Sequence, residues 1–141
     1  MSPELVALLG LHIVGLVAWC AALLYLPALI AAGPAVAAGL RWRRDMPPAR
    51  AVFTMAATPA ALLAIISGSM LVLLERTFGV WLVFKLTAVA GMVATHVLVG
   101  LLVLRKEDNP HATLIRPCIV LTLTSIALIA SVLWLVLAKP F

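Results

Sequence analysis

The chain has 141 residues, of which 65% are hydrophobic and 11% are charged, and its mean hydropathy is +1.22. A soluble domain of this length needs far more polar surface, so the composition excludes a soluble protein and indicates an integral membrane protein. The net charge of +5 does not indicate nucleic-acid binding, because the basic residues lie in loops between apolar stretches.

Four apolar stretches follow one another along the chain, and a membrane-spanning helix needs about 20 such residues. We expect spans at about residues 5–32, 51–74, 80–104 and 113–138. The connections "GPAVAAGLRWRRDMPPAR", "ERTFG" and "RKEDNPHA" contain the breaker residues and nearly all the charge. Helices are the only open-chain structure that satisfies the backbone in lipid. The sequence therefore predicts one domain, residues 1–141, folded as an all-α antiparallel bundle of four transmembrane helices.

The basic residues predict how this bundle is oriented. The third connection contains Arg105 and Lys106, and the second contains only Arg76, beside Glu75. The first connection contains four arginines: Arg41, Arg43, Arg44 and Arg50. Basic loops stay in the cytoplasm, so we expect the first and third connections there and both termini on the outer, periplasmic side.

Three ionisable side chains lie inside the predicted spans: His12, Lys85 and His96. Such groups are costly in lipid and usually face the bundle interior for a functional reason. Lys85 and His96 are eleven residues apart, which at 3.6 residues per turn returns to nearly the same helix face. Met92 lies one turn before His96 on that face, so the third span presents a stripe of potential ligands or proton carriers.

The first span presents a second face, formed by His12, Gly15 and Trp19. Gly15 would let a flat group or another helix come close. With a rise of 1.5 Å per residue, His12 and Lys85 both lie roughly 10 Å below the outer boundary. His96 lies about 16 Å deeper than Lys85. Two axial ligands of one iron need one depth, so His12 pairs better with Lys85, as a neutral lysine, unless each histidine serves its own cofactor.

Several interpretations of these polar residues remain open. The histidines could hydrogen-bond to neighbouring helices while Lys85 extends toward the membrane surface. His12 and His96 could instead bind a metal or haem, because imidazole is a common axial ligand of haem. The set could also form a proton pathway. Two histidines and one lysine among so few intramembrane polar groups favour a cofactor for the set as a whole.

The same stretches resemble a known family. "LHIVGLVAWCAALLYLP" resembles the first helix of the HemJ-type protoporphyrinogen oxidase family, with its histidine, glycine, tryptophan and Tyr-Leu-Pro. "ATPAALLAIISG" resembles the second helix through Thr58, Pro59 and Gly68, and "WLVFKLTAVAGMVATH" resembles the third through Lys85 and His96. The resemblance covers most of the chain in the same order, and many members also end in "KPF".

The resemblance implies a small haem b protein of the bacterial inner membrane that oxidises protoporphyrinogen IX to protoporphyrin IX. Electrons would pass to a quinone or a respiratory chain, and the partners would be lipid, a tetrapyrrole, respiratory-complex subunits and a second copy of the chain. His12 and His96 are then the candidate metal ligands, and Lys85 is the candidate catalytic residue. Trp19 and Met92 share their helix faces and complete the predicted cofactor site.

One departure from the family pattern favours an alternative. The family continues after Tyr-Leu-Pro with an arginine that could pair with a tetrapyrrole propionate, and this chain has Ala28 there. The related CopD-like proteins, which are associated with copper handling, share the four-helix pattern with intramembrane histidines. Thioether and imidazole groups suit copper. The alternatives are therefore a non-catalytic CopD-like copper- or haem-handling protein, an accessory subunit of a respiratory membrane complex, and a purely structural helix bundle.

Overall fold

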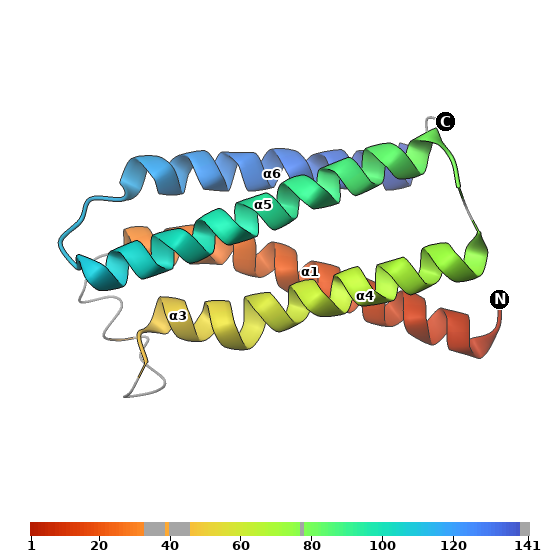
Figure 1. Ribbon diagram of the computed structural model, residues 1–141, viewed down its shortest axis with the longest axis horizontal. Helices are drawn as coiled ribbons and strands as arrows, with labels where there is room; N and C mark the ends of the chain where they lie inside the picture. Colours follow the sequence, from red (N-terminus) through yellow and green to blue (C-terminus); the bar gives the residue numbers. More distant parts are fainter. Residues whose placement is uncertain (33–38, 40–45, 77, 139–141) are drawn as a thin grey trace.

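Figure 1 shows a computed structural model of the chain, which describes residues 1–32, 39, 46–76 and 78–138. Four stretches are helical, long and apolar enough to cross a membrane: Pro3–Ala31, Pro48–Glu75, Val80–Asp108 and Ile115–Ala138. The described part of the chain contains no strand. The prediction of an all-α, multi-pass membrane protein with four spans is confirmed.

Helix α1 (Pro3–Ala31) begins with a defined cap. The hydroxyl of Ser2 accepts a hydrogen bond of 3.3 Å from the backbone N–H of Leu5, and Pro3 occupies the first turn, where its missing N–H costs nothing. The helix ends at Ala32, whose backbone is extended. The cap places the start of the helix two residues before the predicted span.

The second span consists of three consecutive pieces. Helix α3 (Pro48–Val52) leads into the π-helical turn η1 (Phe53–Ala57), which leads into helix α4 (Thr58–Glu75). In the π-turn the backbone N–H of Thr58 donates to the carbonyl of Phe53, five residues earlier. Helix α4 ends at Arg76, which adopts a left-handed conformation with φ of 50°. The sequence predicts one span here, in which Pro59 kinks or begins a helix, and the π-turn that precedes this proline is a finding of the structure.

The last two helices are joined by the short third connection. Helix α5 (Val80–Asp108) extends four residues past its predicted end, and helix α6 (Ile115–Ala138) returns antiparallel to it. The extension carries Arg105 and Lys106 in the last helical turn, where cations interact favourably with the helix dipole.

Helix α1 is the central element of the bundle. It packs most extensively against α4, and it also contacts α5 and α6, while α5 packs along α6. Its buried side chains form much of the core, and they include Trp19, Leu23, Leu26 and Ile30. Without water to drive helix association, close packing of this kind holds membrane helices together. Large apolar side chains cover the outward faces, where lipid would surround them.

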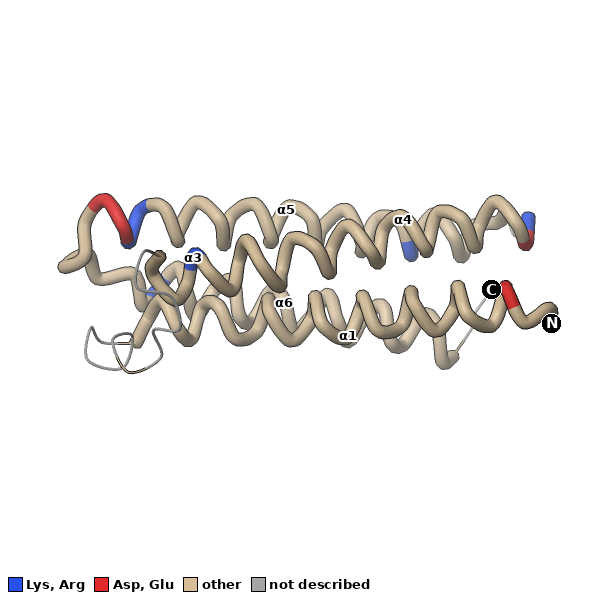
Figure 2. Tube along the Cα trace, turned by 90° about the horizontal axis from the view of Figure 1, so that it is seen from below, with Lys and Arg blue, Asp and Glu red and all other residues tan. Residues whose placement is uncertain are grey.

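Among the described residues, charge is confined almost entirely to the two ends of the bundle (Figure 2). The start of α1 and the end of α6 lie at one end (Figure 1), as an even number of spans requires. The basic end of α5 lies at the other end, where Arg50 and Glu107 form an ion pair of 3.3 Å. Of the four arginines of the first connection, Arg41, Arg43 and Arg44 lie outside the described residues.

Candidate cofactor site

His12 lies against helix α4, in the half of the bundle that contains the chain's start. Its Nδ1 atom is 2.8 Å from the carbonyl oxygen of Ala64 and 3.3 Å from the hydroxyl of Ser67. A carbonyl can only accept a hydrogen bond, so Nδ1 must carry the ring proton. The Ser67 hydroxyl itself donates to the carbonyl of Leu63. In neutral His12, Nε2 therefore keeps its lone pair, and it has no hydrogen-bond partner among the described residues.

Two glycines allow this close approach. A Cβ atom added at Gly68 would lie 2.7 Å from Cε1 of His12, so the imidazole occupies the space that a side chain would fill. A Cβ atom at Gly15 would lie 3.0 Å from the backbone nitrogen of Ala64. Of the two roles considered for Gly15, the structure therefore shows contact with another helix, because the backbone of α4 fills the space beside it.

Lys85 lies near the same end of the bundle, on α5. Its Nζ atom is 5.1 Å from the ring centroid of Trp81, a distance typical of a cation–π contact. The indole of Trp81 donates a hydrogen bond of 2.7 Å to the carbonyl of Leu135, which ties α5 to α6. Lys85 is within electrostatic range of both His12 and Glu75. The Trp81 ring stabilises Lys85 at this position when the amine is protonated.

His96 belongs to a separate cluster deeper in the bundle. The indole N–H of Trp19 donates to Nδ1 of His96 at 3.3 Å, because tryptophan has no acceptor. Nε2 must then carry the ring proton, and it lies 3.3 Å from the hydroxyl of Thr58. The Phe53 ring stacks on the imidazole, with centroids 4.6 Å apart and planes inclined by 22°. Both nitrogens of His96 are therefore engaged by the protein.

The two histidines do not share one site. Trp19 follows His12 by seven residues, about 10 Å along the helix, and His96 is level with Trp19. Met92 is almost completely buried in the core on the same helix as His96. The structure thus places His12 and Lys85 near one end and Trp19, Met92 and His96 deeper. Among the described residues, no group of three or more His, Cys, Asp or Glu side chains could hold a metal ion.

Residues outside the predicted set complete both clusters. The family resemblance indicates Gly68 and Thr58, but not their contacts with His12 and His96. Small residues such as Ser67 indicate close helix packing, and not a hydrogen bond to an imidazole. Phe53 carries no sequence signal, because its position depends on the π-turn.

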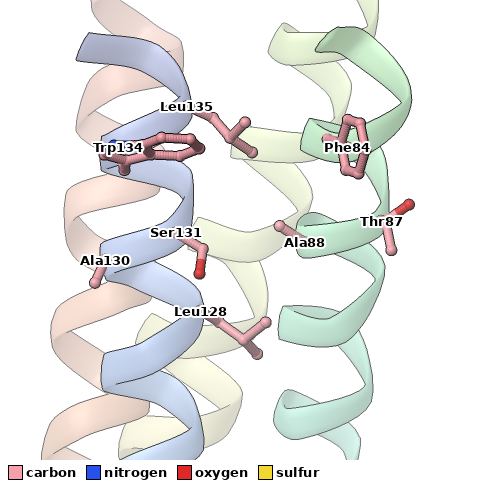
Figure 3. Close-up of a pocket in the computed structure, with 8 residues that line it drawn as sticks. All are labelled: Phe84, Thr87, Ala88, Leu128, Ala130, Ser131, Trp134 and Leu135. Atoms are coloured by element: carbon pink, nitrogen blue, oxygen red, sulfur yellow. The ribbon is translucent and has the colours of Figure 1, made fainter. Parts of the chain in front are cut away.

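A groove of about 570 Å³ lies between α5 and α6 (Figure 3). Its lining is mostly apolar and includes Phe84, Thr87 and Ala88 on one wall and Leu128, Ser131 and Trp134 on the other. None of the predicted site residues lines it. His12 thus has a free Nε2 that could bind a haem iron, but His12 does not line this groove.

Comparisons of the chain with protein-family models, with curated proteins and with solved structures find no match.

Proposed function

We propose that this chain is a haem b-binding redox protein of a bacterial inner membrane, as its resemblance to the HemJ-type oxidases implies. The observation that supports the proposal most is the hydrogen bond from Nδ1 of His12 to the carbonyl of Ala64. Metal-bound histidines usually donate their other ring N–H to a carbonyl or carboxylate, which fixes the ring and its tautomer. His12 has this arrangement inside a membrane span, and its Nε2 lone pair remains for a ligand.

In this proposal His12 is the axial ligand and Lys85 is the catalytic residue. Its ammonium form pairs with a carboxylate of the tetrapyrrole, and its neutral amine accepts a proton that the substrate loses on oxidation and passes it on. A bound haem supplies one-electron transfer. In the HemJ interpretation the substrate of the protein is protoporphyrinogen IX, and the electrons removed from it pass to a quinone or a respiratory partner. His96 is left out of the proposed ligand set, because both of its nitrogens are occupied.

The proposal also includes the orientation of the protein in the membrane, which the basic connections indicate. With the first and third connections in the cytoplasm, both termini are periplasmic. His12 and Lys85 then lie toward the outer leaflet, and the His96 cluster lies deeper.

An absorption spectrum of the purified protein tests haem binding. We expect a Soret band and, after reduction, sharp α and β bands. His12→Ala should lose most of the haem, while His111→Ala should retain it, because His111 is exposed on the third connection. Copper in the purified protein without a tetrapyrrole would support the CopD-like alternative and sink the proposal. Unchanged haem content in His12→Ala would exclude His12 as the ligand.

Rescue of a bacterial strain that lacks protoporphyrinogen oxidase separates an enzyme from a haem-bearing subunit. We expect the wild-type chain to rescue growth and Lys85→Met to fail while it retains haem. A haem-loaded wild-type chain that does not rescue growth would favour the accessory-subunit interpretation.

A further inference from the structure

The hydrogen bonds around His96 connect three spans. Trp19 belongs to α1, His96 to α5, and Thr58 to the second span. We propose that a cluster of four side chains stabilises the π-turn Phe53–Ala57 against conversion to an α-helical turn, and that this turn is a hinge between α3 and α4. We call it the His96 cluster, and it is formed by Trp19, Phe53, Thr58 and His96.

The hydrogen bonds of the cluster run in one direction. Trp19 donates to Nδ1 of His96, and Nε2–H of His96 donates to the Thr58 hydroxyl. That hydroxyl then donates to the carbonyl of Phe53 at 3.0 Å. Each donor has one acceptor, so the removal of any one group leaves a partly buried partner unsatisfied. The series ends on the carbonyl that defines the π-turn.

This carbonyl explains how the cluster stabilises the wider turn. In an α-helix the carbonyl of Phe53 would accept the N–H of Ala57, four residues later. In the π-turn it accepts both the N–H and the hydroxyl of Thr58. Conversion to an α-helical turn would rotate the preceding residues by about 100° around the helix axis. That rotation would move the Phe53 ring away from His96, so the two turns correspond to two distinct arrangements of α3.

Helix α5 leaves space for the Phe53 ring when residues 53–57 form the π-turn. A Cβ atom at Gly100 would lie 2.7 Å from Cζ of Phe53, so this glycine leaves room for the ring one turn beyond His96. On the other side of the turn, Arg50 of α3 pairs with Glu107 at the end of α5. The π-turn therefore lies between a partly buried attachment at His96 and an exposed ion pair. Exposed ion pairs are weak, so the His96 cluster determines which arrangement is populated.

Hydrogen exchange of the full-length protein in lipid nanodiscs tests the hinge. Thr58→Val removes the hydroxyl and keeps a β-branched side chain. We expect amide exchange across residues 48–58 to become about fivefold faster, as the loss of one buried hydrogen bond predicts. Exchange across residues 62–72 should stay as in the wild type. Thr58→Ser keeps the hydroxyl and should behave like the wild type.

Thr124→Val is the matched control. Within the described ranges, the Thr124 hydroxyl bonds only to the carbonyl of Val120 in its own helix, so its loss should not change exchange at residues 48–58. Trp19→Phe, which removes the first donor and keeps an aromatic ring, provides a second test and should also accelerate exchange there. Exchange at residues 48–58 within about twofold of wild type in both Thr58→Val and Trp19→Phe would overturn the proposal. An equal acceleration in Thr124→Val would also overturn it.

Discussion

His12 and His96 are held by hydrogen bonds of opposite polarity. The partner of Nδ1 in His12 is a carbonyl, which can only accept, and the partner of Nδ1 in His96 is an indole N–H, which can only donate. His12 therefore keeps a free Nε2 lone pair, and His96 uses both nitrogens within the protein. This difference makes His12 the better candidate ligand, although both residues are histidines inside a membrane span.

The first residue-scale prediction concerns these tautomers. In haem-free protein labelled with ¹⁵N-histidine, His12 should be the Nδ1–H tautomer and His96 the Nε2–H tautomer. Nitrogen chemical shifts distinguish the two forms, and His12→Ala and His96→Gln assign the signals. Detection of one common tautomer for both residues would contradict the hydrogen-bond assignments.

The second residue-scale prediction concerns Gly68. An added methyl group would lie 2.7 Å from the His12 ring, so Gly68→Ala should displace the imidazole and lower haem content as His12→Ala does. Gly10→Ala is the matched control, because nothing lies within 4 Å of a Cβ atom there. The ratio of Soret to protein absorbance measures both variants. Full haem content in folded Gly68→Ala would argue against His12 as the ligand.

At the scale of elements, the contact between α1 and α4 depends on small residues. Gly15 meets the α4 backbone at Ala60 and Ala64, and neither backbone group can move without displacing its helix. Gly15→Ala should therefore destabilise the bundle by about 1–3 kcal/mol. Gly10→Ala should be neutral, or stabilising by up to about 1 kcal/mol, because alanine has the higher helix propensity.

The midpoint of unfolding in detergent mixtures checks this pair of variants. Equal midpoints for Gly15→Ala and Gly10→Ala would show that α1 and α4 approach less closely than the structure describes. The π-turn belongs to the same scale, since it contacts α1 and its Phe53 ring packs against His96 and Gly100 of α5.

At the scale of the whole molecule, the four spans place the start of α1 and the end of α6 at one end, and the basic connections predict that this end is periplasmic. A periplasm-dependent phosphatase fused after residue 141 should be active, and the same reporter inserted in the first connection should be inactive. A cytoplasmic fluorescent reporter should give the reverse pattern. A phosphatase signal from the first connection would reverse the assigned orientation.

The sequence by itself determined the class, the number of spans and their approximate limits. Lipid offers no hydrogen-bond partners to the backbone, so about 20 consecutive apolar residues have essentially one available structure. Spacing at 3.6 residues per turn also determined that His12 shares a face with Trp19, and Lys85 with Met92 and His96. These are properties within single helices, where sequence separation converts directly into direction and depth.

Only the tertiary structure decided what each of these faces contacts. The rotation of one helix against another depends on the close fit of Gly15, Gly68 and Gly100 to their neighbours, and composition does not encode that fit. The fit places His12 on the carbonyl of Ala64 and leaves its Nε2 free. It also encloses His96 between Trp19, Phe53 and Thr58 through a π-turn that no apolar pattern predicts. Two intramembrane histidines thus acquire different chemistry, because hydrogen-bond polarity is set by neighbours distant in the chain.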